Sequence, residues 1–276
     1  MRRALTYAAV AVITANLAAG CDTGGSEQAA APPSVPSTAP ASTPTTAPPS
    51  TEPAPTASPS TEPAPTASPT PKPTASAKPQ RLKSGVKGAR VVALQQRLTE
   101  LGYWNGEADG TFGGLTQQAV FALQKAAGLG RDGVVGPKTQ KALENGVRPK
   151  AKSTSGRVVE INLKRQLLML VDDGKVSQVF NTSTGSMEHY EQKGSTYLAD
   201  TPSGRFRVSR QIDGWRHAPL GLLWRPKYFN GGIAVHGANS VPPYPASHGC
   251  ARLSISAMNH LWTSNEIPID TRVWVY

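Results

Sequence analysis

The feature that most limits how this chain can fold is the stretch from residue 22 to residue 80, which consists almost entirely of Ala, Pro, Ser, Thr and Gly. Within it the decapeptide PSTEPAPTAS occurs twice in succession, over residues 49–58 and 59–68. Such a composition offers too few apolar side chains for a packed core, and its prolines favour extended polyproline conformations. We therefore expect a disordered linker over residues 22–80 and a folded part that begins near residue 81.

Residues 1–21 have the pattern of an export signal. Arg2 and Arg3 precede an apolar run, and small residues stand immediately before Cys21, which is the layout of a secretory signal peptide. The segment resembles a bacterial lipoprotein signal, and this resemblance implies that Cys21 carries a lipid. The protein would then be exported and held at the outer face of the cytoplasmic membrane, on a tether that reaches into the cell wall. The alternative is an ordinary cleaved signal peptide and a secreted protein.

The first folded region, residues 81–147, contains two related segments. DGTFGGLTQQAV begins at Asp109 and DGVVGPKTQKAL begins at Asp132, and in each an Asp-Gly turn leads into a helix. Apolar residues at steps of three and four predict an amphipathic helix before them: Val91, Leu94, Leu98 and Leu101. The sequence predicts a small all-α domain in which both aspartates form turns and do not act as an acid pair.

This doubled Asp-Gly pattern resembles the three-helix peptidoglycan-binding domain. The resemblance implies that residues 81–147 bind the glycan and stem peptides of peptidoglycan and take no part in catalysis.

The chain has a net charge of +11, and basic surfaces attract polyanions. For an exported protein we expect these to be anionic polymers of the wall, with membrane contact only through the lipid anchor. No nucleic-acid-binding motif is present, so we expect no nucleic-acid partner. The alternative is that the excess of lysine and arginine only keeps the surface soluble.

Residues 156–276 have a different pattern, with short runs rich in Val, Ile and aromatic residues between glycine-containing turns. Such runs predict β-strands: RVVEINL, QLLMLV, KVSQVFN, GRFRVS, GGIAVHG and TRVWVY. One helix is predicted in SISAMNHLWTSN, with Ile255, Met258, Leu261 and Trp262 on its buried face. The predicted architecture is a small all-α domain followed by a mainly-β sandwich domain.

Cys250, in the segment SHGC, has no disulfide partner if Cys21 is lipidated or removed. A lone thiol in an exported protein is a candidate reactive group, although a free cysteine is also often a small buried hydrophobe. Cys250 can act as a nucleophile only as the thiolate, and a neighbouring imidazole can stabilise that form by accepting the thiol proton. Two histidines qualify, His236 and His248, and the residue pattern alone does not rank them.

The surrounding residues add to the nucleophile interpretation. In the strand GIAVHG, alternation places the His236 side chain on the face opposite Ile233 and Val235. Gly249 permits a tight turn whose backbone N–H groups, its own and that of Cys250, can face an oxyanion. Zinc ligation by His236, His248 and Cys250 is an alternative, but no HExxH or CxxC motif accompanies them. We expect no metal and no cofactor.

His236 and the segment SHGCAR, with STGS near Thr184, DTPSGRFRV and the closing DTRVWVY, resemble the signature of the L,D-transpeptidase (YkuD-like) catalytic domain over residues 156–276. The resemblance implies a cysteine acyltransferase that attacks the bond between the third residue of a peptidoglycan stem and the following D-alanine. It implies that Cys250 is the nucleophile, His236 the proton acceptor and donor, and His248 an orienting residue.

Three more residues are expected to contact substrate: Arg252, whose guanidinium can hold a carboxylate, Ser247 and Tyr228. A surface role for Arg252 is the alternative, and we expect Phe229 in the core.

Two functional alternatives stay open at this point. The thioester can pass to water, which would make the protein an L,D-carboxypeptidase. The second domain can also be inert, which would leave a non-catalytic wall-binding lipoprotein.

Overall fold

The computed structural model describes residues 81–276, so the predicted signal peptide, the predicted linker and Cys21 lie outside the described residues. Residues 81–147 form three helices, as predicted: α1 (Ala89–Glu100), α2 (Gly114–Ala127) and α3 (Pro137–Glu144). Over residues 81–276 we find no helix with the length and apolar character to cross a bilayer.

Two buried glutamines fasten the two Asp-Gly turns in the same way. Gln95 Nε2 donates to Asp109 Oδ1 at 2.8 Å, and Gln124 Nε2 donates to Asp132 Oδ1 at 2.7 Å. In each case the glutamine Oε1 accepts from the N–H of the glycine that follows the aspartate. The duplication in sequence is therefore a duplication of a turn and its anchor, which confirms that both aspartates form turns.

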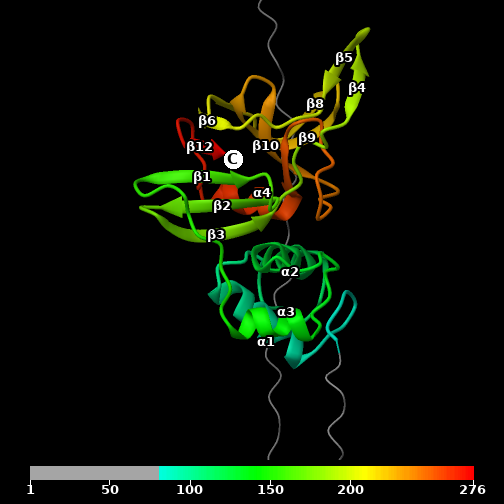
Figure 1. Cartoon of the computed structure of the whole chain (residues 1–276), viewed down its shortest axis with the longest axis vertical. Helices are drawn as coiled ribbons and strands as arrows, with labels where there is room; N and C mark the ends of the chain where they lie inside the picture. The colour runs from blue at the N-terminus through cyan, green and yellow to red at the C-terminus, as the bar shows by residue number, and fades with distance from the viewer. Residues whose placement is uncertain (1–80) are drawn as a thin grey trace, which may run out of the picture. The chain divides into compact units, whose positions relative to one another are not determined.

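The remaining residues form two sheets, a hairpin and one helix, α4 (Ile255–Thr263). The first sheet has the order β3-β2-β1-β12-β6, with bounds β1 (Arg157–Asn162), β2 (Leu167–Asp172), β3 (Lys175–Asn181), β6 (Gly204–Arg207) and β12 (Arg272–Val275). The second has the order β11-β10-β9-β7, with β8 also paired to β9: β7 (Arg210–Gln211), β8 (Trp215–Ala218), β9 (Gly221–Asn230), β10 (Ile233–Ala238) and β11 (Ala251–Ser254). The hairpin joins β4 (His189–Gln192) to β5 (Ser195–Leu198) and projects from the domain (Figure 1).

One apolar core joins the two sheets and α4. It includes side chains from β1, β10 and β11, together with Phe229, as expected, and with Met258 and Leu261 from α4. Ile255 and Trp262 are only half-buried, so the predicted buried face of this helix is narrower than expected. The six predicted strands are all present, and the domain is the mainly-β sandwich that the sequence predicted.

The apolar pattern did not single out the longest strand, β9. Its middle holds Arg225, Pro226 and Lys227, which interrupt the apolar run that normally predicts a strand. The structure accommodates both charges: Arg225 pairs with Asp213 at 2.8 Å, and Lys227 Nζ donates to Gln211 Oε1 at 2.7 Å.

The helical module packs against the outer face of the first sheet. On β2 the side chains alternate, so that Leu168 and Leu170 enter the sandwich core while Leu167, Met169 and Val171 join the core of the helical module. Burial on both faces explains why this strand is a continuous apolar run. Helix α2 lies beside β3 (Figure 1). The two modules therefore share buried surface and are not independent units on a free linker.

A buried lysine lies at this junction. Lys125 Nζ, on α2, donates to the carbonyl oxygens of Gln166 and Thr182 at 2.8 and 3.0 Å and to Asn181 Oδ1. Burial lowers the pKa of Lys125 to about 6. The three oxygen acceptors act against this shift, because they match the three donors of the ammonium form. The side chain ties the helical module to the end of β3.

We expect Lys125→Met to destabilise both modules together. The change removes a donor from three buried oxygens, of which the Gln166 carbonyl oxygen keeps the Thr182 N–H at 3.2 Å, and this costs about 2–4 kcal/mol of unfolding free energy. Urea unfolding followed by far-UV circular dichroism measures it, with the exposed Lys138→Met on α3 as the matched control. A loss no larger than that of the control would contradict the role given to Lys125.

Candidate active site

Cys250 lies in the turn before β11, and strand pairing places it. Strands β10 and β11 are parallel, with His236 opposite Arg252 and Val235 opposite Ala251. The sulfur therefore lies beside the start of β10, where Cys250 Sγ accepts from the Ala234 N–H at 3.4 Å. The thiol is half-buried and faces a cavity of about 640 Å³.

His236 is buried on β10 and faces the same cavity. Its Nδ1 is 2.9 Å from the carbonyl oxygen of Gly237. Since a carbonyl can only accept, Nδ1 carries the proton, and Nε2 keeps a lone pair that can receive one. Val235, the preceding residue, points into the core instead, as the predicted alternation requires.

The predicted site residues converge on this one cavity. Its lining includes Cys250, His236, His248, Ser247, Arg252 and Tyr228. Two further arginines line it, Arg210 and Arg216, and no carboxylate of residues 81–276 is among the lining residues. Arg210 lies on the face of Tyr228, with Cζ 3.7 Å from the ring centroid. The sequence did not indicate these two arginines, because they lie on β7 and β8, short strands without an apolar pattern.

A network of hydrogen bonds shapes the turn that carries the thiol. Ser247 Oγ donates to the carbonyl oxygen of Cys250 at 2.6 Å and accepts the Gly249 N–H at 3.0 Å. Thr201 Oγ1 donates to the Gly249 carbonyl oxygen at 2.5 Å. Gly249 has φ of +136°, and a Cβ there would lie 2.7 Å from the Asp200 carbonyl oxygen. Only glycine fits this turn without displacing its neighbours.

These bonds bear on two expectations, the substrate contact of Ser247 and the oxyanion contact of the Gly249 N–H. Ser247 is buried and its hydroxyl is used inside the turn, so it supports the site from within. The Gly249 N–H is bonded to that hydroxyl and is not directed at an oxyanion. Within residues 81–276 no hydrogen bond uses the Cys250 N–H as donor, so this group is available to an acceptor.

His248, the expected orienting residue, contacts the β4–β5 hairpin. It is exposed, and its ring meets Tyr190 of the β4–β5 hairpin edge-on, with centroids 4.8 Å apart. His248, two residues before Cys250, thus lies at the exposed rim of the cavity, whereas His236 on β10 lies at its buried floor.

Two threonines support the site from motifs that had no assigned role. The carbonyl oxygen of Thr184, in STGS, accepts the Ser247 N–H at 2.9 Å. Thr201, in DTPSG, accepts the Gly185 N–H as well as holding Gly249. The motifs were visible in the sequence, but their function depends on contacts between distant segments.

Electrostatics favours a neutral resting pair. Burial raises the pKa of the Cys250 thiol, and burial lowers the pKa of His236 to about 4. Both groups are then uncharged near pH 7. These shifts favour the neutral pair in the resting state, because a buried ion pair would have to offset the desolvation of two charges.

We expect alkylation of Cys250 by iodoacetamide to follow this pKa. Because the folded-state pKa is raised, the thiolate fraction near pH 7 is lower than for an exposed cysteine, and the rate should rise with pH to a midpoint above the ordinary value of about 8.5. Mass spectrometry of the peptide that carries Cys250 measures it, with urea-unfolded protein as the control. A midpoint below that of the unfolded protein would contradict the neutral pair.

A separate cavity of about 740 Å³ lies in the helical module. It is lined by α1, α3 and the segments beside them, including Arg81, Arg90, Ala93, Arg97 and Gln140. It shares no lining residue with the cavity at Cys250.

Comparison with known families agrees with this division. Residues 87–143 match the family described as a putative peptidoglycan binding domain, and residues 156–275 match the L,D-transpeptidase catalytic domain. The crystal structure of an L,D-transpeptidase from Xylanimonas cellulosilytica, residues 123–326, is 56% identical with a TM-score of 0.71. The match covers 72% of this chain and 99% of that one.

Similarity to curated proteins is more local. The N-acetylmuramoyl-L-alanine amidase CwlL of Bacillus licheniformis is 46% identical over 79 residues, 28% of this chain and 22% of the relative. A probable N-acetylmuramoyl-L-alanine amidase of the same species is 33% identical over 116 residues, 41% of this chain and 32% of the relative. The chain thus spans about a third or less of these two relatives.

Proposed function

Because this chain belongs to the L,D-transpeptidase family, we propose that it is a peptidoglycan L,D-transpeptidase that works through Cys250 and His236. The observation that carries the proposal is the pair itself: a half-buried thiol and an imidazole whose Nε2 keeps its lone pair face one cavity. The substrates are the stem peptides of peptidoglycan.

The first half-reaction forms a thioester. Cys250 Sγ attacks the carbonyl carbon between the third stem residue and D-alanine, and its proton passes to His236 Nε2. The Cys250 N–H stabilises the oxyanion. When the C–N bond breaks, the imidazolium returns the proton to the amino group of the departing D-alanine. Starting from a neutral pair, the proton moves as the sulfur attacks, so no separated charge has to be maintained in the buried site.

The second half-reaction transfers the acyl group. An amine of a neighbouring stem attacks the thioester, His236 accepts its proton, and the thiol is restored. The product is a cross-link between two third residues. Transfer to water would instead give a trimmed stem.

Arginines hold the substrate in this scheme. Stem peptides end in carboxylates, and Arg252, Arg210 and Arg216 line the cavity without a carboxylate among them. Tyr228 supports the Arg210 guanidinium through its ring face. The position of Arg252 in the cavity lining supports a role in binding substrate. The contact between Tyr228 and Arg210 supports an indirect role of Tyr228 in substrate binding.

We expect Cys250→Ala to abolish D-alanine release from a tetrapeptide stem and His236→Gln to lower it by about 10²–10⁴-fold, the usual contribution of a general base. His248→Gln is the matched control and should lose less than about tenfold, since its ring lies at the rim. D-alanine is quantified by chromatography, and circular dichroism verifies folding.

Mass analysis of the products separates the outcomes. Dimers joined through third residues support transpeptidation, and tripeptides without dimers would assign hydrolysis instead. Full activity in folded Cys250→Ala would refute the nucleophile.

The helical module binds the wall in this proposal, and its cavity between α1 and α3 receives the polymer. Ala93→Trp would fill that cavity from α1, and sedimentation with purified insoluble peptidoglycan should fall at least fivefold. Gln96→Trp, an equally exposed change on the same helix that does not line the cavity, is the control. Equal sedimentation of the two variants would argue against this cavity. Deletion of the module is a poor test, because β2 and β3 would lose apolar cover.

The proposed place of work is outside the cytoplasm, in the cell wall. The relatives and the peptidoglycan-binding match support a wall location. Anchoring through a lipid on Cys21 and attraction to anionic wall polymers are further parts of the proposal, and they rest on the signal-like residues 1–21 and the net charge of +11.

A further inference from the structure

A buried carboxylate fixes the segment that joins the two modules. Glu160, on β1, accepts the N–H groups of Lys152 and Ser153 at 2.9 and 2.6 Å and the Tyr276 hydroxyl at 2.8 Å. This holds the Lys152 ammonium over the Tyr276 ring, 3.7 Å from its centroid. Lys152 is therefore a positioned cation, although the residue is exposed.

Beside this segment lies a groove of about 620 Å³ between residues 152–155 and strands β6 and β12. We call it the basic groove, because its charged lining residues are all cations: Lys152, Arg205, Arg207 and Arg272. In the part of the chain that the structure describes, no carboxylate lines the basic groove, and the groove shares no lining residue with the cavity at Cys250.

The arrangement of these arginines is electrostatically unfavourable, because two of them stand directly opposite each other. In the antiparallel pairing of β6 and β12, Arg207 stands opposite Arg272 and Arg205 stands opposite Trp274. Directly opposed like charges destabilise a sheet. Arg205 is held over the Trp274 ring, with Cζ 4.2 Å from its centroid.

Their charges remain uncompensated. Arg207 Nη1 donates to the Asp270 carbonyl oxygen at 2.8 Å, and Arg272 donates to the carbonyl oxygens of Ser155 and Arg157. Carbonyl oxygens fix the orientation of a guanidinium group but do not neutralise its charge. Within residues 81–276, none of the four basic groove cations belongs to an ion pair.

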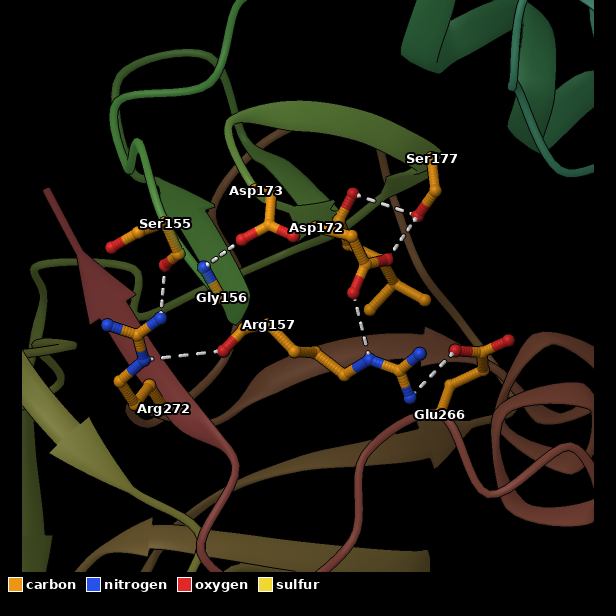
Figure 2. Close-up of polar contacts among 9 residues, drawn as sticks. Ser155, Gly156, Arg157, Asp172, Asp173, Ser177, Glu266 and Arg272 are labelled. Atoms are coloured by element: carbon orange, nitrogen blue, oxygen red, sulfur yellow. Dashed lines mark hydrogen bonds and ion pairs between the residues drawn. The ribbon is translucent and has the colours of Figure 1, made fainter.

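A neighbouring arginine shows the contrast. Figure 2 shows Arg157 directed to Asp172 and Glu266, whereas Arg272 is directed to the carbonyl oxygens of Ser155 and Arg157. The two strands that carry them, β1 and β12, are adjacent. The sheet therefore pairs one arginine with acids and leaves the groove arginines available.

We propose that the basic groove binds the phosphodiester backbone of an anionic polymer. Guanidinium groups match phosphate oxygens in pairs, and oriented arginines lose little freedom on binding. A lipid surface fits less well, because membrane-binding surfaces combine cations with exposed apolar side chains. None of the large exposed apolar residues within residues 81–276 lines the groove. The inference deepens the proposed function and rests on its wall location.

The test uses synthetic poly(glycerol phosphate) and the full chain. Arg205→Gln with Arg207→Gln should weaken binding in calorimetry at least tenfold and reduce its dependence on salt concentration, since fewer phosphates are neutralised. Arg157→Gln is the matched control and should change the Kd less than twofold. Urea unfolding should show the double variant at least as stable as the wild type, because the opposed charges are relieved.

Two results would overturn the inference: equal binding by the double variant and the wild type, or an equal loss in Arg157→Gln. Wild-type binding to phosphatidylglycerol vesicles without binding to the polymer would assign lipid headgroups and would overturn it too. D-alanine release from a soluble stem should be unchanged in the double variant. If the wild type released no D-alanine, this would count against the proposed function. The comparison of polymer affinities would still test the basic groove.

Discussion

The parallel pairing of β10 with β11 is the interaction on which the rest of the site depends. It places His236 opposite Arg252 and brings Cys250, one residue before β11, against the Ala234 N–H. Bonds from Thr184, Thr201 and Ser247 then fix the turn between the strands. His236 and Arg252 thus lie on two neighbouring strands and Cys250 lies directly before the second of them, and rigid strands hold side chains more accurately than loops do.

The same sheet construction explains how binding and catalysis are joined in one body. Strand β2 is buried on both faces, with alternate residues in the sandwich core and in the core of the helical module. Lys125 ties α2 to Thr182, whose hydroxyl donates to the Arg252 carbonyl oxygen at 2.8 Å. A continuous set of contacts therefore runs from the helix that packs the wall-binding module to the strand beside the thiol.

The cavity at Cys250 and the basic groove differ in how their charged groups are arranged. In the first cavity, burial keeps the Cys250 thiol and the His236 imidazole neutral. The arginines that line this cavity have no carboxylate among the other described lining residues. At the basic groove, backbone carbonyls hold the arginines in place without neutralising them. Both arrangements leave positive potential in concave surfaces, and such surfaces concentrate anionic ligands.

The sequence by itself determined the parts: two folded modules, six strands, the turn role of Asp109 and Asp132, and six of the residues that line the cavity at Cys250. These follow from local patterns and from motifs, because turns, periodicity and residue type are local properties. Only the tertiary structure decided what those residues do. Ser247 serves inside its turn, His248 lies at the rim, and the arginines of β6, β7, β8 and β12 gather in two cavities. Strand register sets these relations, and register depends on contacts between segments far apart in the chain.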